Sequence, residues 1–197
     1  MTLALHPDAQ DLLFRTARTA TRFTDQPVGE DEVRAVYDLV KLGPTAMNAN
    51  PLRVLLVRSP QARERLAVHM AEGNRRKVLD APLVAVLAAD VDFHDDLPRL
   101  FPHAPGARDR FAEDELARED VAVRNAMLQA GYFIVGVRAA GLAAGPMTGM
   151  DAAGVEKELF PDGRHRVVLV VALGHPAPGA GHPRGPRPDY DEVVSTV

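Results

Sequence analysis

The chain has 197 residues, of which 46% are hydrophobic and 25% charged, a composition typical of a folded globular protein rather than a disordered one. Its length predicts a single domain, residues 1–197, and excludes three. The 27 acidic and 23 basic side chains give a net charge of −4, which argues against a dedicated nucleic-acid-binding protein, and the absence of cysteine excludes disulfides and thiolate metal sites.

No targeting or membrane-spanning segment is predicted. The first ten residues lack the basic region and the apolar core of a signal peptide. The longest apolar runs are about seven residues, far short of the roughly 20 that a bilayer requires. We therefore expect a cytoplasmic protein with no membrane partner.

Two helices are predicted in the first third of the chain. The first carries an apolar cluster at 12–14, and we expect it to end at residues 18–22. The second begins after Gly29, with three acidic residues at 30–32 that suit the positive end of the helix dipole, and it stops before Pro44.

Three later segments are predicted to be strands. Residues 54–57, 83–89 and 167–173 are rich in Val and Leu and show no polar alternation. Strands that are buried on both faces have this pattern. Because helical stretches separate them, we expect an α+β fold in which helices wrap a sheet.

Residues 114–140 are predicted to form one long helix. Its apolar positions recur at steps of three, four and seven, and residues 128–137 are apolar nearly all round. A helix of that kind lies in a core or in a subunit interface. We interpret it as a buried central helix that is shared with a second copy of the chain, in a homodimer.

Two segments look poor in regular structure. Residues 93–111 contain three prolines and are long for a simple connection, so we expect a lid or a binding loop there. Residues 174–188 are dominated by Pro and Gly, and their only charged side chains are Arg184 and Arg187. This segment is predicted to be an extended arm.

The familiar catalytic and metal-binding motifs are missing, so no catalytic side chain and no metal site is predicted. Asp90, Asp92 and His94 alternate after the second predicted strand, but without a further ligand nearby we interpret them as a solvated strand end. The three glycines between 141 and 149 are interpreted as a helix C-cap and turn.

The remaining polar groups stand at helix and loop boundaries. Cationic and amide side chains occur in 18–22, in 45–51, at Asn74 and Lys77, and in the arm. Arginine forks bind phosphate, and amides bind polar heterocycles. The pattern is consistent with a phosphate-bearing cofactor without naming it.

These segments resemble, in order, the motifs of the FMN-dependent nitroreductase superfamily. The similarity spans nearly the whole chain, and two further segments, LPRLFPH at 97–103 and GPMTGMD at 145–151, look most like its malonic semialdehyde reductase branch. The motifs are RTATRFTDQPV at 18–28, GPTAMNANP at 43–51, GNRRKVLDAP at 73–82, AGLAAGPM at 140–147 and RPDYDEVV at 187–194.

The resemblance implies a mixed β-sheet wrapped by helices and an obligate homodimer with two FMN sites at its interface. It implies that Arg18 and Arg187 hold the FMN phosphate with Arg184 nearby, and that the 45–50 loop comes from the partner. Asn74 and Lys77 would face the pyrimidine edge of the flavin. The full set of implied cofactor-binding residues is Arg18, Thr19, Thr21, Thr45, Asn48, Asn50, Asn74, Lys77, Gly145, Pro146, Arg184 and Arg187.

The sequence departs from the family pattern at three positions. Ala17 stands where a basic residue is usual, Thr21 where Lys or Arg is common, and Leu52 where an aromatic often follows Pro51. The first two departures leave fewer cations for the phosphate, so binding would depend more on Arg184 and Arg187.

The activity implied by the resemblance is FMN-dependent NAD(P)H oxidoreduction. Hydride would pass from NADH or NADPH to flavin N5 and then, in a ping-pong sequence, to malonic semialdehyde (3-oxopropanoate), a nitroaromatic or a quinone. Phe101, His103 and Phe111 are predicted to line the acceptor side. Two alternatives remain open: an enzyme that consumes the flavin itself, and a non-catalytic flavin-binding module for sensing or storage.

Overall fold

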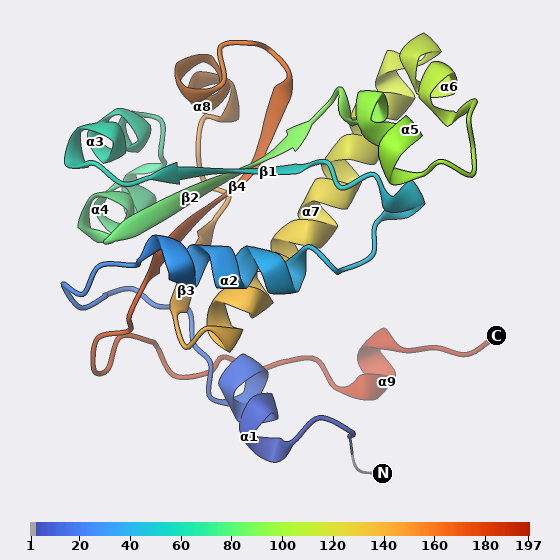
Figure 1. Cartoon of the computed structure of the whole chain (residues 1–197). Coiled ribbons are helices and arrows are strands. Elements are labelled where there is room, and N and C mark those ends of the chain that lie inside the picture. Colours follow the sequence, from blue (N-terminus) through green and yellow to red (C-terminus); the bar gives the residue numbers. More distant parts are fainter. Residues whose placement is uncertain (1–2) are drawn as a thin grey trace.

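The computed structural model describes residues 3–197 and has an α+β architecture (Figure 1). Its strands form one sheet in the order β1-β2-β4-β3, and every neighbouring pair is antiparallel. The expected α+β class is confirmed, but the parallel pairing of a mixed sheet does not occur among these strands. The strands are β1 (Leu52–Val57), β2 (Leu83–Asp90), β3 (Ala143–Met147) and β4 (His165–Gly174).

The two central strands are covered on both faces. Every residue of β2 is buried, and its side chains alternate between two hydrophobic clusters, with Leu83, Ala85 and Leu87 in one and Val84, Val86 and Ala88 in the other. This double burial explains why the sequence of β2 shows no polar alternation.

Helices α2 (Glu30–Val40) and α7 (Glu115–Ala139) cover one face of the sheet (Figure 1). The side chain of Asp114 caps the start of α7 by accepting a hydrogen bond from the Ala117 amide at 3.0 Å. A Cβ at Gly136 would lie 2.2 Å from Cγ1 of Val40, so this glycine lets the two helices touch. No helix within residues 3–197 is long and apolar enough to cross a membrane.

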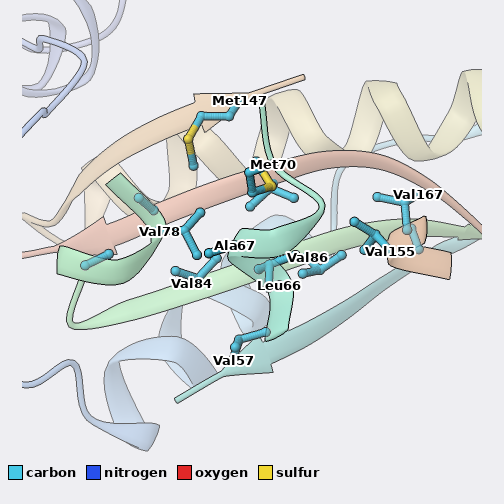
Figure 2. Close-up of a cluster of buried hydrophobic side chains, with 14 residues drawn as sticks. Val57, Leu66, Ala67, Met70, Val78, Val84, Val86, Met147, Val155 and Val167 are labelled. Carbon is cyan, nitrogen blue, oxygen red and sulfur yellow. The ribbon is translucent and has the colours of Figure 1, made fainter. Parts of the chain in front are cut away.

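The opposite face is covered by α3 (Pro60–Val68), α4 (Glu72–Asp80) and α8 (Ala152–Leu159). Figure 2 shows their shared core, in which Leu66, Met70, Val78 and Val155 point toward the sheet residues Val84 and Val86. The labelled side chains come from all three helices and from β1, β2, β3 and β4, so this cluster ties the whole layer together.

Residues 91–113 form short helices rather than the irregular loop expected from the sequence. They are η3 (Phe93–Asp96), α5 (Leu97–Leu100) and α6 (Ala107–Glu113). Phe93 and Phe111 are both buried and meet edge to face, with ring centroids 5.3 Å apart. That contact anchors the segment to its own small core, shared with α7.

The first and the last helical segments both lie below the sheet in the view of Figure 1. The first helical segment, α1 (Pro7–Gln10) continued by η1 (Asp11–Arg15), ends earlier than the sequence suggested. Residues 18–23 are extended instead and bridge the C-terminal arm at Ala20–Gly181 and Phe23–Pro176. The arm at 174–188 is mostly irregular, as predicted, and one short helix, α9 (Tyr190–Val193), follows it.

Strand β3 was missed by the sequence analysis. The interpretation of 141–149 as a cap and turn holds only for Gly141, whose φ of 76° ends α7. Two residues later the chain pairs with β4 from Ala143 to Met147. A strand of sequence AAGPM carries small residues and a proline, which is possible because β3 is an edge strand.

Candidate functional site

Three extended segments run side by side at the β3 edge of the sheet. The amide of Ala20 donates to the Ala144 carbonyl at 3.4 Å, and the amide and hydroxyl of Thr21 both donate to the Ala180 carbonyl, at 2.9 and 2.8 Å. A Cβ at Gly145 would lie 2.9 Å from the carbonyl oxygen of Ala20. Glycine at this position therefore lets the 18–23 segment lie directly on β3.

Asn74 and Lys77 of α4 lie just past the end of β3. The Asn74 amide nitrogen donates to the Gly149 carbonyl at 3.1 Å, and Lys77 Nζ donates to Asn74 Oδ1, also at 3.1 Å. The backbone of Ala71 holds the same Gly149 carbonyl at 3.0 Å. The predicted pair is thus confirmed as neighbours on one helix face, aligned by the loop that follows β3.

Arg18 and Arg184 converge on the end of η1. Arg18 Nη1 donates to the carbonyls of Arg15 and Ala17, and Arg184 Nη2 donates to the same two oxygens. The two guanidinium groups are therefore neighbours. Arg187 lies further along the arm, exposed, with Nη1 donating to the Gly185 and Pro186 carbonyls, and it does not line the cavity beside Arg18.

That cavity has a volume of about 230 Å³ and lies between η1, the end of α7 and the arm. Arg138, in the last turn of α7, lines it together with Ala17 and Arg18. Arg138 Nη1 donates to the Leu13 carbonyl at 3.1 Å. Burial, and then the charge of Arg184, lower the pKa of Arg138 from its usual value.

The 45–50 loop lies in a different part of the fold. It joins α2 to β1 and packs near α5, at the end of the sheet away from α4 (Figure 1). Met47, Asn48 and Asn50 have positive φ values of 52°, 50° and 44°, a conformation that costs non-glycine residues energy. Within one chain, the loop is therefore separate from the residues at 74–77.

Two buried amides of α7 hold this strained loop. Asn125 Oδ1 accepts from the Ala46 amide at 2.8 Å. Gln129 Oε1 accepts from the Leu52 amide at 3.0 Å, and its Nε2 donates to Asn50 Oδ1 at 3.2 Å. The hydroxyl of Thr45 accepts from the Asn50 amide, which closes the loop on itself.

Of the three side chains predicted to line the acceptor side, only two are accessible at the surface. Phe111 is buried against Phe93, so its assignment to a substrate wall is wrong. Phe101 is half-buried and meets the exposed His103 edge to face, with centroids 5.1 Å apart. These two aromatic side chains stay together on the segment that receives Asn48, whose side-chain nitrogen donates to the Leu100 carbonyl at 3.0 Å.

The interpretation of Asp90 as part of a solvated strand end is also wrong. Asp90 is 3% exposed and pairs with Arg53 at 2.8 Å and with Arg164 at 3.4 Å. The charge of Asp90 is the main cause of the raised pKa of Arg164. Because it is buried between two guanidinium groups, this carboxylate is a structural ion-pair centre.

Three residues near these sites escaped the sequence analysis: Asn125, Gln129 and Arg138. Gln129 is a lone polar residue in the apolar half of α7, and a buried polar side chain requires a partner. A polar residue within an apolar stretch was therefore the feature of the sequence that could have identified Gln129. Arg138 gave none, because a cation in the last turn of a helix is ordinary.

Comparison with known proteins supports the family resemblance that the sequence motifs suggested, and the similarity to close relatives extends over the whole chain. The family model described as "Nitroreductase family" matches residues 15–175. A Streptomyces coelicolor protein, provisionally named an NADH dehydrogenase/NAD(P)H nitroreductase, is 62% identical over 100% of both chains. A Leptothrix cholodnii protein with the same provisional name is 47% identical, again over 100% of both chains.

Solved structures with the same fold are more distant in sequence. A Bacillus subtilis protein provisionally called a nitroreductase has a TM-score of 0.83 and 24% identity, covering 98% of this chain and 100% of that one. An Exiguobacterium sibiricum protein of the same description, solved in complex with FMN, has a TM-score of 0.80 and 21% identity over 99% and 100%. The fold, the family model and the close relatives agree: the chain belongs to the nitroreductase family.

Proposed function

We propose that this protein is an FMN-dependent NAD(P)H oxidoreductase that reduces a small acceptor. The family depends on FMN and uses NAD(P)H as reductant. Bound FMN would supply the redox chemistry by taking hydride from the nicotinamide and passing it to malonic semialdehyde, a nitroaromatic or a quinone. The observation that carries the proposal is the hydrogen-bonded assembly of the 18–23 segment, β3 and the arm.

The residues at this edge fit the phosphate end of FMN. Arg18 and Arg184 bring two permanent cations to one point, and five N–H donors on each guanidinium leave several free after the carbonyl contacts. Thr19 and Thr21 lie on the same extended segment. Arg187, further along the arm, would have to move toward Arg18 to take part.

Asn74 and Lys77 would hold the ring end. Lys77 is half-buried, and its hydrogen bond to Asn74 fixes the direction of the ammonium group. A cation held there would stabilise negative charge on the pyrimidine edge of a reduced flavin. Gly145 and Pro146 lie on β3. Because Gly145 is buried beneath the Ala20 carbonyl, contact with a flat ring would come from the half-buried Pro146.

A homodimer would bring the 45–50 loop of one subunit to the flavin of the other. Thr45, Asn48 and Asn50 are partly exposed or exposed and are held in a strained shape by α7, which is typical of a functional loop. Exposed apolar side chains on α7 and in the segment that follows the arm offer surface for association. They are Leu116, Met127, Leu128, Tyr190, Val193, Val194 and Val197.

The acceptor would bind beside Phe101 and His103. The strained loop contacts this segment directly through Asn48, so the acceptor wall and the loop would move as one unit. An open slot suits small acceptors of different shapes. No protein nucleophile is needed, which agrees with the lack of catalytic motifs in the sequence.

The test is the visible absorbance spectrum of the purified protein reconstituted with FMN, before and after NADH or NADPH is added without oxygen. We expect flavin bands that bleach with the nicotinamide and return with the acceptor. Bands that persist with both reductants would identify a non-catalytic flavin-binding module. Formation of dimethylbenzimidazole when air is then admitted to the reduced sample would identify the flavin-consuming alternative, because that reaction needs oxygen as oxidant. Failure to bind FMN would contradict the whole proposal.

The Lys77→Ala variant tests the ring end, with Arg76→Ala as its control. Arg76 is the preceding residue, but its Nε pairs with Asp80 on the exposed side of α4. We expect a fall of about 10-fold or more in the rate of flavin reduction for Lys77→Ala, since removing one stabilising donor typically costs that much. Equal rates in the two variants would contradict the placement of Lys77.

A further inference from the structure

Arg18 and Arg138 line the cavity between η1, α7 and the arm, and Arg184 lies beside Arg18 without lining the cavity. Among residues 3–197, Arg18, Arg138 and Arg184 have no carboxylate within ion-pair distance, and their hydrogen bonds go to backbone carbonyls. Arg15, whose carbonyl accepts from Arg18 and Arg184, has its own partner in Asp11 at 3.6 Å. Three neighbouring arginines are thus left without an anion.

Arg138 has a buried hydrogen-bond donor that the described part of the chain does not satisfy. Its Nη1 caps the Leu13 carbonyl, but its Nε is buried and has no hydrogen-bond partner within residues 3–197. A buried N–H without an acceptor destabilises the protein. An anion that accepts a hydrogen bond from this N–H would remove that cost. The neighbouring charge of Arg184 adds repulsion that the same anion would relieve.

The shape of the cavity also favours a small anion. Its volume of about 230 Å³ is below the range of pockets that enclose a whole ligand, so it suits one end of a larger molecule. The short side chain of Ala17 leaves room beside Arg138. A Cβ at Gly181 would lie 2.5 Å from Cβ of Arg18, so the glycine lets the arm close the cavity.

We propose that Arg138 binds the phosphoryl group of the flavin nucleotide in this cavity together with Arg18, while the neighbouring Arg184 adds its positive charge from beside the cavity. The inference rests on the proposed function, because it takes FMN as the ligand. Arg138 comes from the long central helix rather than from the extended segments. It would supply the cation that Ala17 and Thr21 do not provide, and it would make the protein select FMN over riboflavin.

The experiment measures the dissociation constants of FMN and riboflavin for Arg138→Met, Arg138→Lys and the unmodified protein, by quenching of flavin fluorescence. Methionine keeps the length and the packing of the side chain but removes charge and donors. We expect FMN to bind about 10- to 100-fold more weakly to Arg138→Met, with riboflavin unchanged, because only FMN carries the phosphoryl group. Arg138→Lys should lie between the two.

Arg22→Met is the matched control. Arg22 lies on the same extended segment, is exposed and donates to the Gly179 carbonyl, but it does not line the cavity. Its FMN affinity should equal that of the unmodified protein. An equal loss of FMN and riboflavin in Arg138→Met, or no loss of either, would overturn the inference and leave Arg138 as a cap of η1.

A second measurement separates the inference from the proposed function. Inorganic phosphate, compared with chloride at the same ionic strength, should raise the thermal midpoint of the unmodified apoprotein but not that of Arg138→Met. If the protein binds neither flavin while phosphate has this effect, the proposed function fails and the phosphoryl site stands. If phosphate stabilises both proteins equally, the assignment of Arg138 fails.

Discussion

Two groups of arginines in this molecule differ in what neutralises them. At the end of β2, Arg53 and Arg164 surround the buried Asp90 at 2.8 and 3.4 Å. At the end of η1, Arg18, Arg138 and Arg184 meet only carbonyl oxygens among the described residues. We call the first the paired cluster and the second the unpaired cluster.

The difference separates structural arginines from those available for a ligand. In the paired cluster each arginine has a carboxylate partner within the chain, so these ion pairs contribute to folding rather than to ligand binding. In the unpaired cluster the missing charge has to come from outside, which makes the cluster a candidate for binding an anion. Counting arginines would not distinguish the two groups; finding the partner of each one does.

Removing the carboxylate of the paired cluster should have the largest effect. Asp90→Ala leaves Arg53 and Arg164 facing each other and removes the acceptor of the Asp92 amide. We expect the free energy of unfolding to fall by about 2–4 kcal/mol, less than for a fully buried pair because both arginines are partly exposed and can be rehydrated. Urea unfolding of the apoprotein measures it.

Asp96→Ala is the control for this prediction. Asp96 also approaches Arg53, at 3.7 Å, but its side chain is 41% exposed. An exposed pair contributes roughly 0–1 kcal/mol. If the free energy of unfolding falls equally in the two variants, the burial of Asp90 does not explain how much the paired cluster contributes to stability.

A neutral counterpart of the paired cluster is the amide pair under the 45–50 loop. Gln129→Leu keeps the volume of the side chain but leaves the Leu52 amide and Asn50 Oδ1 without their partners. Leaving a buried donor unsatisfied costs roughly 1–3 kcal/mol. We expect that loss in urea unfolding, with increased hydrogen exchange confined to residues 45–52. Arg124→Lys, at an exposed position on the same helix, keeps the charge of that side chain and should change neither.

The sequence predicted the parts of the fold in which local pattern and burial agree. Helix α7 was predicted at 114–140 and lies at Glu115–Ala139, and the ends of β1, β2 and β4 were each predicted to within two residues. Strand β3 was missed because its small residues carry no strand pattern, and its pairing with β4 depends on contacts far apart in the chain.

The candidate site was predictable only as a set of motifs. Asn74 and Lys77 follow helix spacing, so their contact could be foreseen. The burial of Asp90 and Phe111, and the meeting of Arg138 with Arg18, depend on tertiary packing. A side chain on an apolar helix gives no sign in the sequence of which segment it will face.

Removing an arginine from the unpaired cluster should cost the apoprotein little. Arg138→Met loses one hydrogen bond to the Leu13 carbonyl but also a buried unpaired N–H and the repulsion from Arg184. We expect the free energy of unfolding without ligand to change by less than about 1 kcal/mol. A loss as large as that of Asp90→Ala would show that the unpaired cluster is structural after all.

The smallest effect is expected at an ion pair outside both clusters. The hydrogen bond from His165, followed by the one from the Arg164 amide, lowers the pKa of the exposed Asp162 carboxyl. A carboxyl whose pKa is lower in the folded state stabilises the fold above its unfolded pKa, and that contribution is lost as pH falls through the folded value. Asp162→Asn should therefore reduce the urea midpoint slightly at pH 7, and the difference from the unmodified protein should shrink as the pH drops below about 4. A difference that stays constant with pH would mean that the Asp162 charge contributes nothing, as is common for exposed pairs.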